Sequence, residues 1–327
     1  MNKPEHIIWI FTAMCNLDCL HCYTHRFRNL EELDLTEKLR LAREIGESGV
    51  EYVNLTGGEP LIHPHLSFIL ESLSDYDVDK SIITNGTVVS EDIANLLYKT
   101  ETYVFVTVEG PKHIHNDIRG KWTYEATTSG VELLKRRLGS ISIVTTVNKI
   151  NYRSLYEVVD YAVKIDADEL ALIPVMPSGR ATQTKIFISA NEYLEALKKT
   201  LERAHEYGLK VSAWCTPWIP SLGLGIGSSF CRNMSGMDID PAGNVLLCDI
   251  LDFKITNIRG RRLIDVYSDF RNSVLVKTVR NPPQLPLACK MCNISLGCRG
   301  GCFARSYILK GGLNAGDPLC PKLSSAP

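Results

Sequence analysis

The chain has 327 residues, of which 45% are hydrophobic and 22% are charged, and its formal net charge at pH 7 is −1. This is the composition of an ordinary globular protein, long enough for one large domain or two. The nearly neutral charge excludes a general attraction to nucleic acid or to an anionic membrane. Because no secretory signal and no apolar run of about 18 residues is present, we expect a cytoplasmic protein.

Strand-like and helix-like segments alternate along the first two thirds of the chain. Apolar runs predict six strands, at 7–12, 52–55, 80–84, 103–108, 142–147 and 169–173. Helical periodicity predicts helices at 36–48, 64–73, 91–98, 124–138, 155–164 and 191–207, and we expect a long loop from the fourth strand to Gly120. Such alternation indicates parallel βαβ units, in either an open doubly wound sheet or an incomplete barrel. In both architectures, sites form at the carboxyl ends of the strands.

The eleven cysteines require an explanation. Their number is odd and disulfides are rare in a reducing cytoplasm, so metal or cluster ligation is the better interpretation. Three of them lie near the amino terminus, and the other eight begin only at Cys215. This gap predicts two metal-bearing regions separated by a scaffold.

The first three cysteines, Cys15, Cys19 and Cys22, directly follow the first predicted strand. A [4Fe–4S] cluster normally takes four cysteine ligands, so three would leave one iron open. Open coordination sites are where metal centres carry out chemistry, whereas closed sites tend to be structural. The alternative is a zinc site with His21 or His25 as the fourth ligand.

Two motifs together resemble the radical S-adenosylmethionine (SAM) superfamily: C-x3-C-x2-C at 15–22, and Gly-Gly-Glu-Pro at 57–60 after the second strand. The resemblance covers roughly residues 5–208 and implies an α/β fold, a partial (β/α)6 TIM-like barrel. It also implies that the three cysteines bind a [4Fe–4S] cluster whose open iron takes the amino and carboxylate groups of SAM. An electron from the cluster then splits SAM into methionine and a 5′-deoxyadenosyl radical, which abstracts a substrate hydrogen.

The resemblance assigns SAM contacts to several residues near these motifs. Gly57 and Gly58 let the backbone approach a ligand closely, and Glu59 accepts hydrogen bonds from the SAM ammonium group. The alternative for this motif is a turn that merely ends a strand. His21 stands where the family often places an aromatic ring against the adenine, and Tyr23 is a neighbouring candidate.

Two later strand ends supply further candidates. Asn85, after the third strand, is either a SAM contact or a turn residue. The segment 107–120 is similar to a Ser-x-Asp-Gly-Pro … His-Asp … Arg-Gly pattern of the peptide-modifying branch, with Thr107 and Glu109 replacing Ser and Asp. The match implies that Thr107 and Arg119 hold the SAM carboxylate, which suits the bidentate guanidinium of arginine. A surface ion pair is the alternative for Arg119.

The last third of the chain contains seven spaced cysteines, Cys231, Cys248, Cys289, Cys292, Cys298, Cys302 and Cys320. Their spacing resembles the seven-cysteine signature of the SPASM domain, so we expect a radical SAM core at 1–208 and a small iron–sulfur SPASM domain at 209–327. The pattern implies two auxiliary [4Fe–4S] clusters, and therefore three clusters in total. The outer auxiliary cluster takes Cys289, Cys292, Cys298 and Cys320. The inner one takes Cys231, Cys248 and Cys302, with either Cys215 or an open iron completing it. The alternatives are a zinc ribbon and, for Cys215, a buried inert thiol.

One carboxylate in this region is a candidate catalytic residue. Asp249 follows Cys248 directly, and an Asp at this place acts as general base in the sulfatase-maturing relatives. A solvated or capping carboxylate is the alternative for Asp249. Asp240, in Asp-Pro-Ala-Gly at 240–243, is expected to form a turn between strands.

The leading functional hypothesis is a radical SAM enzyme that oxidises or cross-links a peptide or protein side chain. The alternatives are tailoring of a tetrapyrrole side chain, as in the haem-synthesis relatives, and a non-catalytic metal-binding scaffold. Because the first strand begins at about Ile7, we expect no fused peptide-recognition domain before it. Family chemistry implies an electron donor such as flavodoxin or ferredoxin. From the net charge and the lack of a long apolar run, we expect no nucleic-acid or membrane partner.

Overall fold

A computed structural model describes residues 3–324. Its single sheet has ten strands in the order β10-β9-β8-β1-β2-β3-β4-β5-β6-β7. The strands are β1 (His6–Thr12), β2 (Tyr52–Gly57), β3 (Asp79–Thr84), β4 (Thr102–Thr107), β5 (Ser142–Val147), β6 (Leu170–Pro174), β7 (Val211–Ala213), β8 (Met237–Ile239), β9 (Asn244–Leu246) and β10 (Lys254–Asn257).

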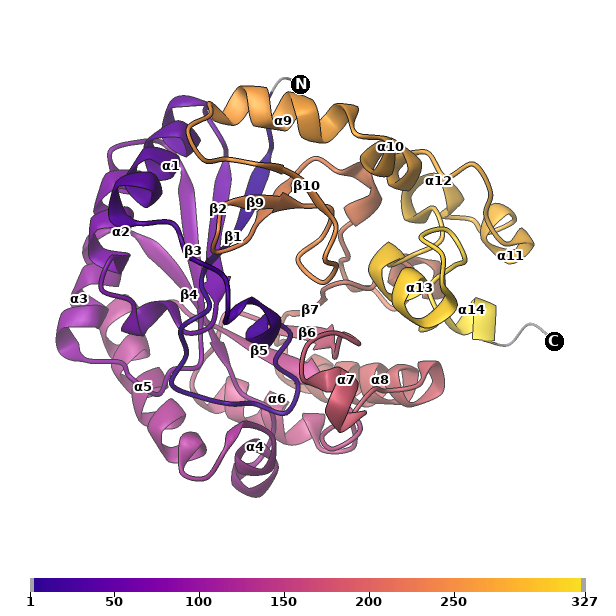
Figure 1. The fold of residues 1–327 in the computed structure, drawn as a ribbon. Helices are drawn as coiled ribbons and strands as arrows, with labels where there is room; N and C mark the ends of the chain where they lie inside the picture. Colours follow the sequence, from indigo (N-terminus) through magenta and orange to yellow (C-terminus); the bar gives the residue numbers. More distant parts are fainter. Residues whose placement is uncertain (1–2, 325–327) are drawn as a thin grey trace.

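Helices cover the outer face of this sheet, which curves into an incomplete barrel (Figure 1). The helices of the first two thirds are α1 (Leu35–Glu47), α2 (Leu66–Ser74), α3 (Glu91–Lys99), α4 (Lys112–Arg119), α5 (Thr123–Leu138), α6 (Leu155–Lys164), α7 (Ala181–Thr184) and α8 (Ala190–Tyr207). Those of the last third are α9 (Leu263–Asn272), α10 (Val274–Arg280), α11 (Leu287–Lys290), α12 (Ser295–Cys298), α13 (Phe303–Lys310) and α14 (Pro321–Ser324). Short 3-10 turns lie at η1 (Thr24–Phe27), η2 (Pro60–Ile62), η3 (Ile219–Leu222) and η4 (Cys231–Asn233).

The six predicted strands are confirmed as β1 to β6, which pair in parallel with their neighbours in chain order. Trp9 and Phe11 on β1 are fully buried, as is Val53 on β2. Runs of apolar residues are expected in a parallel sheet because helices cover it. Of the two predicted architectures, the incomplete barrel is the one observed.

Four further strands had no predicted bounds, although two of them, β8 and β9, are the strands expected on either side of the turn at Asp240. β7 pairs in parallel with β6 at one edge of the sheet, and β8 pairs in parallel with β1 at the other edge. β9 and β10 then continue from β8 as antiparallel strands. With three or four residues each, these strands are too short for a hydrophobic period to be recognised. The domain boundary that we propose at residue 208 therefore lies within a continuous sheet.

The long loop expected after the fourth strand is wrong in part, because α4 occupies residues 112–119. Its buried residues are His115, Ile118 and Arg119, so the buried face is mostly polar and gives no apolar period. Gly120, with φ 120°, ends the helix. The predicted turn at Asp240 is confirmed, since its carboxylate accepts from the backbone N–H groups of Ala242 and Asn244, each at 2.9 Å.

None of the helices in the described part of the chain is both long and apolar enough to cross a lipid bilayer.

Candidate active site

The three amino-terminal cysteines lie together on the loop that follows β1. Burial raises the pKa of Cys19 to about 11; the charge of Arg119 opposes this rise, and the neighbouring thiols of Cys22 and Cys15 add to it. The Arg119 Nη1 atom lies 3.8 Å from the Cys19 sulfur. All three thiols are free of disulfides. Three converging thiols beside a buried cation fit a thiolate-bound cluster, because the guanidinium compensates part of the negative charge.

Gly57 and Gly58 hold this loop against the end of β2. The Gly58 N–H donates to the Thr12 carbonyl at 2.7 Å, and the Glu59 N–H donates to the Met14 carbonyl at 2.8 Å. A Cβ atom on Gly58 would lie 2.1 Å from the Met14 oxygen. The motif therefore does more than end a strand, because it brings the cysteine loop and the β2 end into backbone contact.

The Glu59 carboxylate is fully buried at the junction of two strand ends. It accepts from the Thr84 hydroxyl at 2.7 Å, from the Asn85 N–H at 2.7 Å and from the Leu61 N–H at 3.0 Å. Burial raises the pKa of Glu59, while these hydrogen bonds oppose the rise. A carboxylate offers about four acceptor sites, so it can still accept one further donor.

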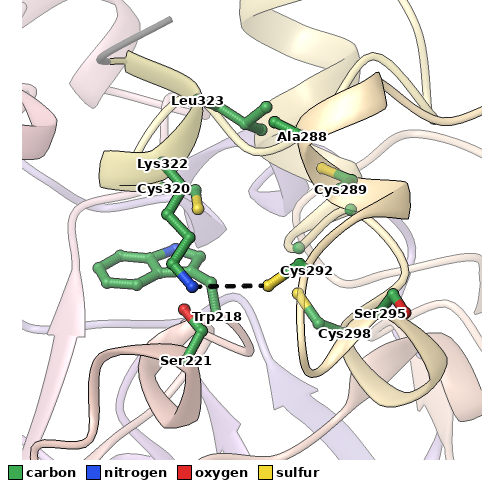
Figure 2. A pocket seen from close by; sticks show the side chains of 12 residues that line it. Trp218, Ser221, Ala288, Cys289, Cys292, Ser295, Cys298, Cys320, Lys322 and Leu323 are labelled. Carbon is green, nitrogen blue, oxygen red and sulfur yellow. Dashed lines mark hydrogen bonds between the residues drawn. The ribbon is translucent and has the colours of Figure 1, made fainter.

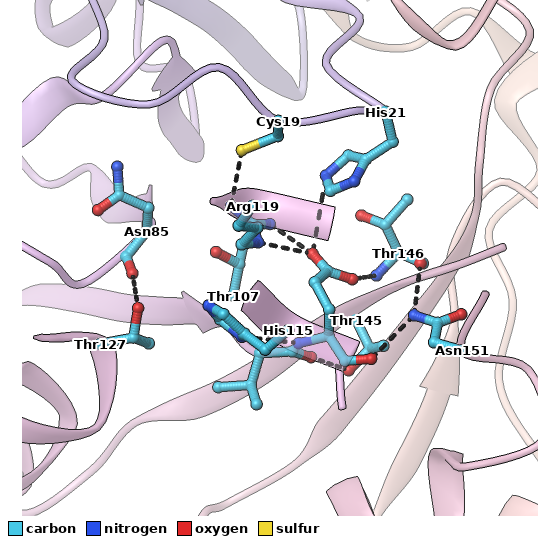
Figure 3. A network of polar contacts seen from close by, with 12 residues as sticks. Cys19, His21, Asn85, Thr107, His115, Arg119, Thr127, Thr145, Thr146 and Asn151 are labelled. Atoms are coloured by element: carbon cyan, nitrogen blue, oxygen red, sulfur yellow. Dashed lines mark hydrogen bonds and ion pairs between the residues drawn. The ribbon is translucent and has the colours of Figure 1, made fainter. Parts of the chain in front are cut away.

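Arg119 makes a buried ion pair rather than a surface one, so the alternative given for it above is wrong (Figure 3). Its Nε atom donates to Glu109 Oε1 at 2.9 Å, and the other Glu109 oxygen accepts from the Thr146 N–H at 2.9 Å. His21 reaches the same carboxylate, with 3.7 Å between His21 Nε2 and Glu109 Oε1. Burial, and then the charge of Arg119, keep the pKa of His21 well below its usual value, so the imidazole is neutral.

Two buried imidazole nitrogens in this network have no hydrogen-bond partner in the described part of the chain. They are His21 Nδ1 and His115 Nε2. The other nitrogen of His115 accepts from the Glu109 N–H at 3.3 Å. A buried polar atom without a hydrogen-bond partner costs folding free energy. An unpaired imidazole nitrogen beside the three thiols therefore fits a site in which a bound polar ligand supplies the partner.

Asn85 and Thr107 lie at neighbouring strand ends and have structural partners. The Asn85 side-chain oxygen accepts from the Thr87 N–H at 2.8 Å, which is the Asx turn expected of a turn residue. Its amide group also donates to the Asn16 side chain on the cysteine loop at 3.0 Å. The Thr107 hydroxyl donates to the Thr84 carbonyl at 3.2 Å.

Tyr23 connects the cysteine loop to the last third of the chain, because its hydroxyl interacts with the Asp249 carboxylate. Burial raises the pKa of Asp249, whereas Tyr23 and Arg26 oppose the rise. Arg26 donates to the Asp249 carbonyl and, at 2.9 Å, to the Ser178 hydroxyl. Asp249 is therefore beside the site and is partly buried.

Arg26 and Asp238 were missed by the sequence analysis. Asp238 accepts from the Asp249 N–H at 2.7 Å, and side-chain atoms of Asp238, Cys248 and Asp249 lie within 4.8 Å of one another. No local signal could have found them, because Arg26 and Asp249 are separated by 223 residues.

The structure brings Cys215, Cys231 and Cys248 toward Cys302. Burial raises the pKa of each of the first three thiols, and the charge of Cys302 adds to each rise. Cys215 has a left-handed backbone, with φ 55°. This neighbourhood supports the interpretation of Cys215 as a fourth inner ligand.

A second pair missed by the sequence analysis supports these inner cysteines. Arg305 donates to the Cys215 carbonyl at 2.6 Å and to the Asp317 carboxylate at 3.0 Å. Asp317 in turn accepts from the Cys302 N–H at 3.0 Å. The pair thus joins two cysteine-bearing segments that are 87 residues apart in sequence.

The remaining four cysteines line one cavity (Figure 2). Trp218 and Lys322 are also part of its wall, and the Lys322 ammonium lies 3.8 Å from the Cys292 sulfur. The four thiols that share the cavity are those of Cys289, Cys292, Cys298 and Cys320.

Comparisons with known proteins agree with this geometry. Residues 9–162 match the model of the Radical SAM superfamily. The AdoMet-dependent heme synthase of Methanosarcina barkeri is 25% identical, over 98% of this chain and 97% of that protein. The mycofactocin maturase MftC of Mycobacterium tuberculosis is also 25% identical, over 100% of this chain and 85% of that protein.

Two solved structures share the fold. Streptococcus suis SuiB bound to the precursor peptide SuiA has a TM-score of 0.79 at 16% identity, covering 98% of this chain and 76% of that chain. AnSMEcpe with bound AdoMet has a TM-score of 0.75 at 20% identity, covering 98% of this chain and 95% of that chain. Together with the cysteine loop and the strand-end motifs, these findings show that residues 9–162 carry a radical SAM domain and that the chain is an enzyme.

Proposed function

We propose that this enzyme uses SAM to abstract a hydrogen from a peptide or protein side chain, and that the product is oxidised or cross-linked. The observation that supports the proposal is that Asp249, beside Cys248, lies against the segment that follows the cysteine loop, where Arg26 donates to the Asp249 carbonyl and Tyr23 faces its carboxylate. A carboxylate and a second group of thiols thus lie near the cysteines that we assign to SAM binding. When bound, SAM and its cluster supply the 5′-deoxyadenosyl radical that removes the hydrogen.

The residues of the chain divide between holding SAM and receiving the substrate. Cys15, Cys19 and Cys22 hold the first cluster. At its remaining acceptor site, Glu59 accepts a hydrogen bond from the ammonium group of SAM. Arg119 and Thr107 face the carboxylate of SAM. We assign the adenine contact to His21 rather than Tyr23, because the Tyr23 hydroxyl already binds Asp249 whereas His21 Nδ1 lacks a partner. Asn85 has a positioning role, because its side chain forms the turn after β3 and its backbone N–H donates to the Glu59 carboxylate.

Two auxiliary clusters complete the proposed cofactor set within a SPASM domain at 209–327. The inner cluster is held by Cys215, Cys231, Cys248 and Cys302, and the outer one by the four cysteines that line the common cavity. These clusters can accept the electron that a substrate radical loses in a net oxidation. An electron donor of the flavodoxin or ferredoxin class reduces the enzyme.

The charges around the cysteine loop favour a peptide over a tetrapyrrole. Three arginines that we do not assign to SAM lie at this loop, and each already binds a carboxylate of the chain. They are Arg26 with Asp252, and Arg28 and Arg180 with Asp18. A tetrapyrrole substrate carries several carboxylates, whose burial would need cations that are free to pair with them. A neutral peptide side chain makes no such demand.

Tetrapyrrole tailoring is the second candidate function. It is favoured by the similarity to the heme synthase of M. barkeri over almost the full length of both proteins. A non-catalytic metal scaffold is not retained, because the chain is an enzyme that carries a radical SAM domain.

The decisive experiment uses anaerobically reconstituted enzyme reduced by dithionite. Iron is counted, 5′-deoxyadenosine is measured, and candidate peptides and iron-coproporphyrin are analysed by mass spectrometry for loss of hydrogen. We expect three clusters per chain, SAM cleavage, and a peptide product lighter than its substrate. Zinc in place of iron at the first three cysteines would contradict the proposal, and oxidation of the porphyrin alone would favour the second candidate.

Asp249→Asn tests the proposed general base. Positioned bases contribute roughly 10²–10⁴-fold to rate, so we expect product formation to fall by at least about 10²-fold while SAM cleavage continues. Asp265→Asn, on the exposed part of α9, is the control and should retain full turnover. Unchanged product formation in Asp249→Asn would exclude the role.

A further inference from the structure

The carboxyl-terminal segment differs sharply in charge from the rest of the chain. Residues 271–327 contain eight Lys or Arg residues and one acidic residue, a formal charge of +7. Because the whole chain carries −1, the preceding 270 residues carry −8. The one acidic residue, Asp317, is buried and paired with Arg305. Seven cations therefore remain at least partly exposed, at Arg271, Lys277, Arg280, Lys290, Arg299, Lys310 and Lys322.

Large apolar side chains are exposed in the same segment. Leu287 is 74% exposed, Met291 79% and Leu296 88%, among the most exposed large apolar side chains of the described residues. Scattered single apolar residues are ordinary on a surface, but three on adjoining short helices and the turn between them indicate a contact face. The segment thus combines apolar groups with a positive field.

Several of these groups are sequence neighbours of the residues that line the cavity of the outer four cysteines, which Figure 2 shows, and Lys322 lines it directly. Leu287 and Lys290 flank the cavity-lining Ala288 and Cys289, Met291 precedes Cys292, and Leu296 follows the lining residue Ser295. We call Leu287, Lys290, Met291, Leu296, Lys310 and Lys322 the outer-site rim.

Two of the rim cations lie near the cavity sulfurs. The Lys322 ammonium lies 3.8 Å from the Cys292 sulfur. Lys310 is close enough to the Cys289 thiol to interact with it electrostatically. The described residues offer no ion-pair partner to Lys290, Lys310 or Lys322, so their charges are available to a partner.

We propose that the outer-site rim docks an acidic one-electron carrier protein of the flavodoxin type directly over the outer cluster. The inference rests on the proposed function, since it requires that the four cavity cysteines hold a cluster. The carrier is favoured over a lipid surface or a nucleic acid because the rim encloses a redox site and mixes apolar with basic groups. Small, wet, electrostatically steered interfaces are typical of electron-transfer partners. One electron passes from the reduced carrier to the oxidised outer cluster and on through the enzyme to the SAM-binding cluster. The auxiliary clusters are therefore oxidised again when the substrate radical forms, and the transfer forms or breaks no bond.

The test compares two double charge reversals in reconstituted holoenzyme. Lys290→Glu with Lys310→Glu alters the rim. Lys99→Glu with Lys164→Glu changes the net charge equally on α3 and α6, on the helical exterior of the barrel. Flavodoxin binding is measured by calorimetry, and reoxidation of the reduced flavin is followed by stopped flow at several salt concentrations. We expect the rim variant to lower the association rate about tenfold and to flatten its salt dependence, whereas the control retains both.

A third variant and two other probes separate the outcomes. Leu296→Ser should weaken flavodoxin binding without changing the salt dependence, because it removes apolar contact only. Cytochrome c, a basic carrier, should not bind. Equal losses in the rim and control variants, or tighter binding to phosphatidylserine vesicles than to flavodoxin through the same lysines, would overturn the proposal.

Failure of the docking inference and failure of the proposed function are distinguishable. Dithionite reduces the enzyme without a carrier protein, so SAM cleavage under dithionite should be unchanged in the rim variant. Absence of SAM cleavage in the unaltered enzyme and in every variant would count against the proposed function. Flavodoxin binding is measured separately by calorimetry, so it would still test the docking inference. Intact SAM cleavage with no flavodoxin binding would overturn the docking inference alone.

Discussion

Arg305 and Asp317 form an ion pair whose side chains are 1% and 0% exposed. Burial disfavours the charge of Arg305, but the Asp317 carboxylate more than compensates and raises the pKa of the guanidinium. Because the pair also binds the Cys302 N–H and the Cys215 carbonyl, it holds two proposed ligands of the inner cluster in position. A buried pair of this kind is costly to break because one charge remains without compensation.

Asp317→Asn should therefore destabilise the protein strongly. We expect a loss of about 3–5 kcal/mol and reduced iron retention at the inner cluster. The exposed pair of Arg262 and Asp265 is the control, because Asp265→Asn should change stability by about 0–1 kcal/mol. Thermal unfolding followed by circular dichroism, with iron counting, checks both variants. Equal unfolding midpoints would show that the buried pair does not hold this region.

At the scale of elements, Glu32 connects three parts of the barrel. It accepts from the Thr12 hydroxyl at 2.8 Å and from the Ala13 N–H at 2.7 Å, just after β1. It also binds Lys38 on α1 at 3.1 Å. His63, after η2, lies 3.4 Å from the same carboxylate. Burial alone would raise the pKa of Glu32, but these donors and the charge of Lys38 outweigh it and lower the pKa to about 2.

A lowered pKa in the folded protein makes the contribution of Glu32 dependent on pH. The carboxylate stabilises the fold fully above its ordinary pKa of 4.5, and this stabilisation is lost as the pH falls through about 2. Because the group is partly exposed, we discount the shift to about 1–2 kcal/mol. Glu32→Gln should therefore lower the unfolding midpoint at pH 7, and the difference should shrink below pH 4.5. A difference that stayed constant down to pH 3 would contradict this account.

At the scale of the whole molecule, one sheet runs through both proposed domains. β8 pairs with β1 and brings Met237 and Ile239, both buried, against the barrel. α9 lies against α1 on the outside, and Leu263 on α9 donates its N–H to Glu44 on α1 at 2.8 Å. The last third is therefore part of the barrel's own core as well as the carrier of the proposed auxiliary clusters.

A truncation tests this dependence. The fragment 1–208 lacks β7 to β10 and exposes strand edges on both sides of the sheet, and exposed edges pair with other chains. We expect this fragment to aggregate, whereas fragment 1–273, which keeps all ten strands and α9, should remain monomeric. Size-exclusion chromatography and circular dichroism are the measurements. A monomeric, cooperatively unfolding 1–208 would instead support a barrel that folds independently.

Much of the fold was predictable because its signals are local. Each of β1 to β6 is an apolar run, and a run of that kind is visible whatever surrounds it. α4 escaped prediction because its buried residues include His115 and Arg119, and polar residues do not signal a buried helix face in the sequence. Their burial is explained only by the Glu109 partner that the folded chain brings to them. β7 and β10 escaped, and β8 and β9 were expected only as unbounded strands around the Asp240 turn, because strands of three or four residues carry too little pattern.

The sequence by itself determined the parallel α/β architecture, the loop of three cysteines, the strand-end motifs and the cysteine spacing of the last third. These depend on composition and spacing within short segments. Only the tertiary structure decided that Arg119 is buried against Glu109, that Tyr23 meets Asp249, and that Arg305 and Asp317 support Cys215 and Cys302. The physical reason is that such contacts join segments distant in the chain, so their partners are decided by how the sheet closes around them.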